Sequence, residues 1–331
     1  MSVLDVVKLN VRFARPDGEV HAVHDLSFEL AAGETLGIVG ESGSGKSQTV
    51  LSLLGLLAAN GRASGTATFE LRDLLALRER ERRAIRGRKI SMIFQDPLSG
   101  LNPVFTIGDQ IVEVLRAHRS IGRKDARKEA IKLLERVQIP DAHRRLDDFP
   151  HQFSGGMRQR VLTAMAIAHG PQVLIADEPT TALDVTVQAQ VLDLLDGLRR
   201  DAGMAVVLIT HDLGIVARHA DRMVVMYSGR VVEEGSVADV FADPRHPYTI
   251  SLLRSIPQLD APVGADLMSI RGHPPLPGSV REGCPFERRC YLGRGRVECL
   301  RSRPALDPAG GPGHLSACHF SDSLQAEEAV A

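Results

Sequence analysis

Cysteine is missing from most of this sequence. No cysteine precedes position 284, and the four that the chain has are Cys284, Cys290, Cys299 and Cys318. Thiols in a reducing compartment rarely form structural disulfides, whereas clusters of thiols bind metal ions. The distribution therefore argues against a disulfide-stabilised secreted fold and favours a metal site near one end of the chain.

Long apolar runs are missing as well. The longest, residues 50–59, has the length of a helix core and falls short of the roughly 18 residues that span a bilayer. Charged side chains at Asp5, Lys8, Arg12 and Arg15 interrupt the apolar pattern of the first residues, so no signal peptide is expected. We expect a cytosolic protein that reaches a membrane only through partners.

The chain also lacks an excess of positive charge. Lys and Arg together number 40 and Asp and Glu 41, so the net charge is −1 and we expect no nucleic-acid partner. One stretch, residues 78–89, is strongly basic. A solvated helix face explains that stretch better than a nucleic-acid patch does.

Short apolar runs alternate with segments of helical periodicity. The predicted strands are residues 3–13, 24–30, 35–39, 90–94, 173–176 and 205–210, and residues 223–227 and 230–234 are expected to form a hairpin. Helices are expected at residues 48–57, 125–137 and 187–199, and residues 96–165 are mostly helical in pattern. This alternation predicts an α/β fold with a largely parallel sheet.

A glycine-rich octapeptide lies between the predicted strand at 35–39 and the predicted helix that follows it. Its residues fit the pattern G-x-x-x-x-G-K-[ST] and are Gly40, Glu41, Ser42, Gly43, Ser44, Gly45, Lys46 and Ser47. Glycines let consecutive backbone N–H groups turn inward around phosphate oxygens, and the helix N-terminus favours negative charge. Lys46 can reach the β- and γ-phosphates of a nucleotide, and the Ser47 hydroxyl can ligate Mg²⁺.

Two carboxylates end the apolar run at residues 173–176. Asp177 at the strand end can bind Mg²⁺, directly or through water, and Glu178 can act as the general base on an attacking water. A strand that ends in two acids is a weak signal by itself, because such acids are often solvated. Downstream of a phosphate-binding loop it predicts a nucleotide-hydrolysing site.

Four further segments resemble those of ATP-binding-cassette (ABC) ATPases. Residues 153–160 (FSGGMRQR) are similar to the signature motif of that family, and Gln95 after a strand matches its Q-loop. His211 matches its switch histidine, and residues 182–184 (ALD) match its D-loop. The order and spacing of the segments agree with the family over residues 3–245.

The resemblance implies a P-loop NTPase fold of the ABC type, with a RecA-like core and an inserted helical subdomain at about residues 96–165. It implies that Gln95 joins Ser47 and Asp177 around Mg²⁺ and that Gln48 belongs to the ATP-binding set. It also implies a dimer in which one chain's signature residues contact the ATP held by the opposite subunit; these are Ser154, Gly155, Gly156 and Met157. Met157 departs from the glutamine of many members, and we expect little effect.

Three more roles follow from the same resemblance. His211 would sense the γ-phosphate, Asp184 would act in the D-loop, and an aromatic residue upstream of the phosphate loop would stack on adenine. Phe13 is the candidate for adenine stacking, and a plain core phenylalanine is the alternative.

Three segments are closer to one branch of the family. Residues 94–103 (FQDPLSGLNP), 150–153 (PHQF) and 245–249 (RHPYT) resemble the ATPase subunits of oligopeptide and dipeptide importers, best the D-type subunit of oligopeptide permeases. The resemblance implies two integral membrane permease subunits, a second and related ATPase subunit, and an extracytoplasmic substrate-binding protein. It places this chain peripherally on the cytoplasmic face of the cell (inner) membrane, with a membrane subunit's coupling helix docking around residues 96–165.

Other functions use the same motor. Related importers carry nickel, glutathione or sugars, and nothing in this chain selects among substrates. An exporter ATPase should lack the HPYT segment and the cysteine-bearing tail. ABC ATPases of DNA repair or translation need a coiled-coil insertion or a second cassette, and this chain has neither.

The two expected domains are residues 1–250, the ATPase, and residues 251–331, a loop-rich extension rich in proline, glycine and arginine that carries the cysteines. Soft thiolate ligands suit either Zn²⁺ or an iron–sulfur cluster, and free thiols or a disulfide are the further alternative. The family resemblance implies a [4Fe–4S] cluster, although the gap between Cys290 and Cys299 is about two residues longer than usual. The nearby Arg288, Arg289, Arg294 and Arg296 would offset thiolate charge or else are solvated.

Overall fold

The computed structural model describes residues 2–95, 100–181, 183–256, 270–276 and 282–324. The chain forms two compact units. The helical unit comprises Met1–Val3, Leu30–Glu34 and Ala76–Ile209; the P-loop unit comprises Leu4–Glu29, Thr35–Leu75 and Thr210–Ala331. The domain boundary near residue 250 stays a prediction.

Three parallel strands form the sheet of the helical unit, in the order β8 (Ala205–Thr210), β7 (Val173–Asp177) and β6 (Ile90–Ile93). Ile90 is in register with Val173, and Val173 with Ala205. Every residue of β7 and β8 is buried, as expected for parallel strands covered on both faces. The three predicted strands are confirmed.

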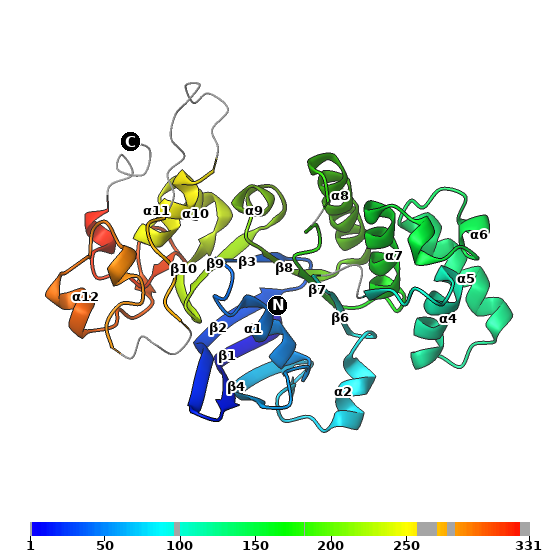
Figure 1. The fold of residues 1–331 in the computed structure, drawn as a ribbon, viewed down its shortest axis with the longest axis horizontal. Coiled ribbons are helices and arrows are strands. Elements are labelled where there is room, and N and C mark those ends of the chain that lie inside the picture. The colour runs from blue at the N-terminus through cyan, green and yellow to red at the C-terminus, as the bar shows by residue number, and fades with distance from the viewer. Residues whose placement is uncertain (1, 96–99, 182, 257–269, 277–281, 325–331) are drawn as a thin grey trace. The chain divides into compact units, whose positions relative to one another are not determined.

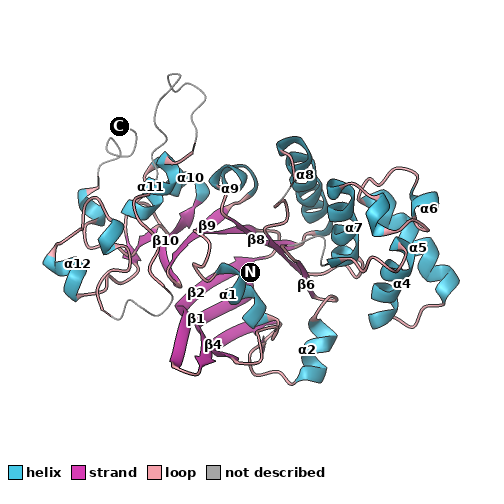
Figure 2. Ribbon diagram, viewed as in Figure 1, coloured by secondary structure: helices cyan, strands magenta, loops and turns pink. Residues whose placement is uncertain are grey.

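The remainder of the helical unit is mostly helix (Figures 1 and 2). Its elements are α2 (Glu79–Ile85), α4 (Ile107–His118), α5 (Arg123–Arg136), α6 (Ala142–Arg145), η1 (Pro150–Gln152), α7 (Gly155–Ile167) and α8 (Val185–Ala202). One apolar cluster holds α4, α5 and α7 together through fully buried side chains such as Ile111, Leu134 and Val161. The helices predicted at 125–137 and 187–199 are confirmed by α5 and α8.

The P-loop unit contains an antiparallel sheet; the sequence predicted two of its strands, at residues 3–13 and 24–30, but not the sheet. Its order is β2 (Gly18–Ala31), β1 (Ser2–Arg15), β4 (Gly61–Phe69) and β5 (Arg72–Asp73). Leu4 pairs with Phe69 and Phe13 with Gly61. The pattern of β4, GRASGTATF, hides this strand because glycine and alanine have low strand propensity, so the prediction of a largely parallel sheet was incomplete.

A second group of strands in this unit runs in the order β3 (Thr35–Val39), β9 (Arg222–Tyr227), β10 (Arg230–Ser236), β12 (Leu315–Ser316) and β11 (Asp307–Pro308). β3 and β9 are parallel, and β9 and β10 form the predicted hairpin. Ser228 and Gly229 both have positive φ at its turn, the conformation that a two-residue hairpin loop of type I′ requires. β12 brings the C-terminal part of the chain onto β10.

The helices of the P-loop unit are short. They are α1 (Lys46–Leu53), α9 (Leu213–His219), α10 (Val237–Ala242), α11 (Pro247–Arg254) and α12 (Val297–Arg301), with η2 (Glu287–Arg289) and η3 (Ser321–Ser323). α1 begins two residues before the predicted start and ends at Leu53, not at residue 57. Gly55, with a φ of 62°, adopts the left-handed conformation that commonly follows a helix end.

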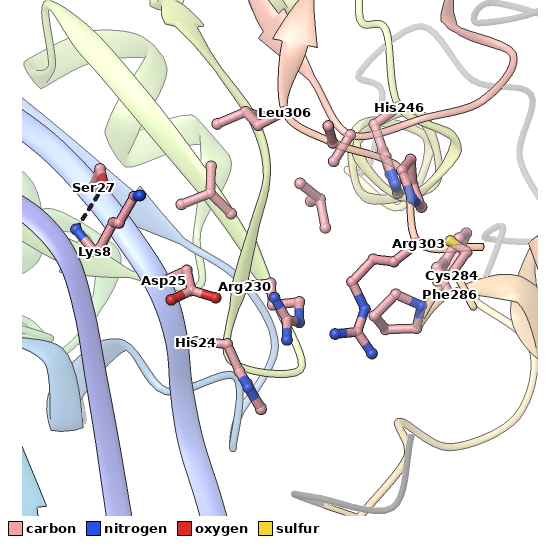
Figure 3. A pocket seen from close by; sticks show the side chains of 16 residues that line it. Lys8, His24, Asp25, Ser27, Arg230, His246, Cys284, Phe286, Arg303 and Leu306 are labelled. Atoms are coloured by element: carbon pink, nitrogen blue, oxygen red, sulfur yellow. Dashed lines mark hydrogen bonds between the residues drawn. The ribbon is translucent and has the colours of Figure 1, made fainter. Parts of the chain in front are cut away.

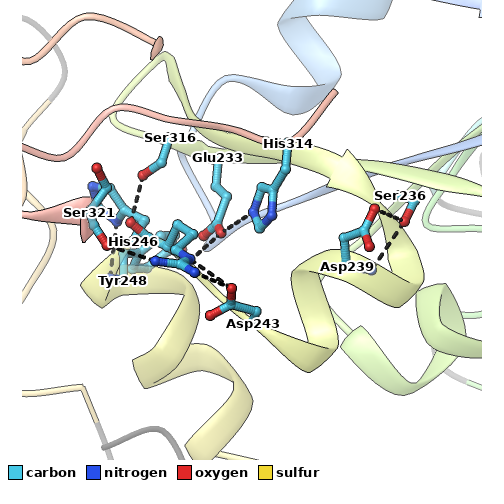
Figure 4. A network of polar contacts seen from close by, with 10 residues as sticks. Glu233, Ser236, Asp239, Asp243, His246, Tyr248, His314, Ser316 and Ser321 are labelled. Carbon is cyan, nitrogen blue, oxygen red and sulfur yellow. Dashed lines mark hydrogen bonds and ion pairs between the residues drawn. The ribbon is translucent and has the colours of Figure 1, made fainter. Parts of the chain in front are cut away.

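The C-terminal extension (described residues 251–256, 270–276 and 282–324) packs into the core of the P-loop unit. The ring of Phe286 lies 5.2 Å from that of Tyr227 and 5.3 Å from that of Tyr248. In the polar network of Figure 4, buried His314 contacts buried Glu233 at 2.8 Å, and the Ser316 hydroxyl donates to the carbonyl oxygen of Arg245. Among the helices of the described residues, none has the length and hydropathy of a membrane span.

One histidine of this core makes stability depend on pH. His246 is 1% exposed, caps α11 by accepting from the backbone N–H of Tyr248, and has its pKa lowered by burial from 6.5 to about 3. Between these values the unfolded chain binds a proton that the folded chain does not. The free energy of unfolding therefore falls as pH falls through this window, by up to about 1.4 kcal/mol per pH unit.

We expect His246→Asn, which keeps a capping acceptor and does not titrate, to lose less stability than the wild type between about pH 7 and about pH 5. Urea unfolding at both pH values measures the difference. His273→Asn, at an exposed histidine, is the matched control and should behave as the wild type. An unchanged pH slope in His246→Asn would contradict the assignment.

Candidate functional site

The phosphate loop predicted from the sequence connects β3 to α1. Gly40 has a φ of 152°, and a Cβ atom there would lie 2.2 Å from the carbonyl oxygen of Met226. Gly45 has a φ of 100°, and its Cβ would lie 2.7 Å from the carbonyl oxygen of Ala22. Both positions therefore require glycine, because the backbone conformation and the backbone neighbours leave no room for a side chain.

The loop presents polar groups suited to phosphate. The Nζ atom of Lys46 donates to the carbonyl oxygens of Gly40 at 2.6 Å and Glu41 at 3.0 Å. Ser44 is 4% exposed, and its hydroxyl has no hydrogen-bond partner among the described residues. An orphaned buried hydroxyl at the N-terminus of a helix is what a bound anion would satisfy.

The two carboxylates at the end of β7 lie in the helical unit. Asp177 is buried, and Glu178 has a φ of 46°, which is uncommon outside glycine. The Oε2 atom of Glu178 accepts from Gln95 Nε2 at 2.8 Å and from Thr181 Oγ1 at 3.0 Å. The structure thus brings together Gln95 and Glu178, which the sequence had placed at the ends of two separate strands.

The signature residues open α7, also in the helical unit. Ser154 caps the helix by accepting from the backbone N–H of Met157 at 3.3 Å. A Cβ on Gly156 would lie 2.3 Å from Val187, so glycine lets α7 approach α8 closely. Met157 packs against the apolar cluster of this unit, a use that suits methionine better than glutamine. Asp184 caps α8, and Ala182 lies outside the described residues.

The remaining predicted residues belong to the P-loop unit. His211 follows β8 and is exposed. Phe13 is partly buried, and its ring packs beside Gly61 of the paired strand β4. This packing agrees with Phe13 as a core phenylalanine, and adenine stacking stays a prediction. Residues 96–99 of the FQDPLSGLNP segment lie outside the described residues.

Two family models match this chain. The model described as "ABC transporter" matches residues 23–181, and the model described as "Oligopeptide/dipeptide transporter, C-terminal region" matches residues 232–299. The oligopeptide transport ATP-binding protein OppD of Salmonella typhimurium is 52% identical over 316 residues, covering 96% of this chain and 93% of the relative. The chain belongs to the ABC transporter ATP-binding proteins of the oligopeptide/dipeptide family.

Other members and structures agree with this family. The dipeptide transport ATP-binding protein DppD of Bacillus subtilis is 49% identical over 330 residues, with 99% of this chain and 97% of the relative covered. A dimeric ATP-binding cassette bound to ADP and phosphate matches with a TM-score of 0.64 and 26% identity, over 71% of this chain and 98% of that chain. The fold of this transporter ATP-binding protein is the α/β P-loop NTPase fold that the sequence predicted.

Sequence reasoning missed one group of contacts at the phosphate loop. Arg289 of the C-terminal extension forms a two-pronged ion pair with Glu41, with Nη1–Oε2 and Nη2–Oε1 distances of 2.7 and 3.0 Å. The hydroxyl of Tyr248 accepts from the backbone N–H of Glu41 at 2.9 Å. Arg289 was predicted to offset thiolate charge or to be solvated. The solvated interpretation was wrong, because the side chain is 6% exposed and pairs with this carboxylate, and the offset of thiolate charge stays a prediction. Nothing in the sequence links positions 41 and 289.

The four cysteines line one small pocket of the extension together with Phe286 and Gly293. No disulfide joins them, and backbone N–H groups donate to two of the sulfurs, Gly293 to Cys290 at 3.1 Å and Phe320 to Cys318 at 3.4 Å. Among the described residues, no group of three or more His, Cys, Asp or Glu is arranged to hold a single metal ion.

Burial dominates the electrostatics of these thiols. It raises the pKa of Cys284 to about 11 and that of Cys318 to about 12, and it also raises the pKa values of Cys290 and Cys299. For Cys290 and Cys299 burial outweighs the opposing effect of the Arg296 charge, which lowers their pKa values.

Another pocket, shown in Figure 3, is lined by residues that include Lys8, His24, Arg230, Cys284 and Arg303. Burial and the nearby Arg303 lower the pKa of Arg230 to about 10. Burial and Arg230 lower the pKa of His24 to about 4. Cationic groups therefore gather at this pocket, where His24 stays neutral near pH 7.

Proposed function

We propose that this chain is the ATP-hydrolysing subunit of an importer that moves oligopeptides or dipeptides across a membrane. The observation that carries the proposal is the intact set of nucleotide residues in a chain 52% identical to OppD over 96% of its length. Importers of nickel, glutathione or sugars, which use the same type of ATPase subunit, remain the alternatives. The substrate-binding pocket lies on another subunit.

The P-loop residues 40–48 bind the phosphates of ATP. Backbone N–H groups, the Lys46 ammonium and the buried Ser44 hydroxyl fit a triphosphate. Ser47, Gln95 and Asp177 would hold Mg²⁺, which supplies neutralisation of the charge that develops on the phosphates. Phe13 contributes the stacking surface for adenine.

Glu178 accepts a proton from the attacking water as general base. The hydrogen bonds from Gln95 and Thr181 to its Oε2 atom orient the carboxylate. His211 senses the γ-phosphate. Gln95 belongs to the segment through which a membrane subunit would act on hydrolysis.

A second, related ATPase subunit completes the machine. Its signature residues contact the ATP held here, and Ser154, Gly155, Gly156 and Met157 do the same for the partner's ATP, with Asp184 in the D-loop. Two integral membrane permease subunits carry the pore and an extracytoplasmic binding protein delivers the substrate, so this chain works peripherally on the cytoplasmic face of the membrane without nucleic acid.

Glu178→Gln should lower ATP turnover by about 100-fold or more, because the amide cannot accept the proton. ATP binding should be retained and the ATP-bound dimer favoured. Phosphate release and nucleotide affinity measure the two effects. Glu113→Gln, an exposed carboxylate on α4, is the matched control. Hydrolysis at half the wild-type rate in Glu178→Gln would show that another residue is the base.

Affinity purification from native membranes in mild detergent tests the partners. We expect two integral membrane subunits and a related ATPase to co-purify, and the binding protein of the same system to carry bound peptide. Recovery of ribosomes or nucleic acid in place of membrane subunits would refute the importer assignment.

We further propose that Cys284, Cys290, Cys299 and Cys318 hold a [4Fe–4S] cluster with a structural role, Zn²⁺ being the alternative. Support comes from four unpaired thiols around one pocket and from N–H donors to two sulfurs. In such a cluster each thiolate would bind a different iron, so the four ligands need not converge on a single ion. Among the described residues, no group of three or more potential ligands converges on a single ion.

Iron and acid-labile sulfide per chain, measured after anaerobic purification, decide between these metals. We expect about four of each in the wild type and a marked loss in Cys290→Ser, whose hydroxyl is a poor ligand for iron. Stoichiometric zinc without iron would reject the cluster and support the alternative.

A further inference from the structure

Glu41 creates an electrostatic conflict inside the phosphate loop. It is the second residue of the octapeptide, and its side chain is 26% exposed. A carboxylate beside a site for a polyanionic ligand repels that ligand, and the repulsion grows where protein shields the charges from water. A loop that binds phosphate therefore needs this charge neutralised.

Arg289 is built to neutralise it. Its side chain is only 6% exposed and meets both carboxylate oxygens of Glu41 in the two-pronged geometry that arginine alone provides. Its remaining donors reach the carbonyl oxygens of Arg271 and Ile270 and the hydroxyl of Tyr227. The guanidinium also lies 5.7 Å from the ring centre of Tyr227.

Arg289 keeps its positive charge in this position. Burial lowers its pKa, but the hydrogen bonds to Glu41 and Tyr227 and the charge of Glu41 outweigh burial and raise it overall. The guanidinium therefore remains a cation at neutral pH and well above it.

Glu41 is also held through its backbone. Its N–H donates to Tyr248, and its carbonyl oxygen accepts from Lys46 Nζ at 3.0 Å and from the Ser44 N–H at 3.2 Å. Glu41, the partner of Arg289, is thus hydrogen-bonded directly to Lys46 of the phosphate loop. A displacement of Glu41 would reach Lys46 without any intermediate residue.

We propose that Arg289 is a positioning residue for ATP binding, which neutralises Glu41 and fixes the phosphate loop from the C-terminal extension. The proposal rests on the proposed role of the P-loop in binding ATP. It also gives the C-terminal extension a role in ATP binding, because Arg289 ends η2 and immediately precedes Cys290.

The test measures the Kd for ATP by equilibrium binding at low ionic strength. Arg289→Gln, which keeps a polar but shorter side chain without the charge, should raise the Kd about 10-fold, because Glu41 then repels the phosphates. The Kd of Arg289→Lys should lie between those of the wild type and Arg289→Gln. Arg288→Gln, at the exposed neighbouring arginine, is the matched control and should bind as the wild type.

The decisive variant is the double substitution Glu41→Gln/Arg289→Gln. Removal of the unpaired carboxylate should recover most of the lost affinity, and added salt should shrink the defect of Arg289→Gln by screening. Melting curves establish that each variant is folded, and the double variant tests the charge argument should Arg289→Gln alone fail to fold.

Two results would overturn the proposal. One is wild-type affinity in folded Arg289→Gln. The other is a double variant as weak as Arg289→Gln, which would make Arg289 a tether of the extension and nothing more. A wild-type chain that binds no ATP would instead refute the proposed function, so the two failures are distinguishable.

Discussion

The close approach of backbone to backbone around the phosphate loop is the constraint on which the P-loop unit depends. Gly40 faces the carbonyl oxygen of Met226 in β9, and Gly45 faces that of Ala22 in β2. These contacts leave no space for a Cβ atom, so two separate sheets can hold the loop at its two ends. Lys46 lies within this loop, where its Nζ atom donates to the carbonyl oxygens of Gly40 and Glu41.

The same loop explains why the C-terminal extension belongs to this unit's core. Tyr248 and Arg289 satisfy the amide and the carboxylate of Glu41, and Tyr227, Tyr248 and Phe286 pack as one aromatic cluster around them. β12 extends the sheet from β10, and the buried pair of His314 and Glu233 joins the extension to it. The extension is therefore continuous with the nucleotide-binding core.

The helical unit applies a different principle. Its polar residues sit where parallel strands end, so that buried strands below them provide a rigid base. Gln95 after β6 and Glu178 after β7 meet there, and the backbone N–H of Glu178, which has a positive φ, donates to the carbonyl oxygen of Ile209 at 2.9 Å. The signature glycine Gly156 is likewise set by the spacing of α7 and α8.

Local sequence was enough to predict the phosphate loop, the acids after β7, most buried strands and the family, because each depends on residue types at short spacing. It failed at β4, whose glycines and alanines carry no strand pattern, and at the end of α1. Only tertiary structure decided that Arg289 meets Glu41, 248 positions away, and that Tyr248 caps the loop. Contacts of this kind come from the packing of the folded chain, and no pattern along the sequence encodes which buried cation pairs with which carboxylate.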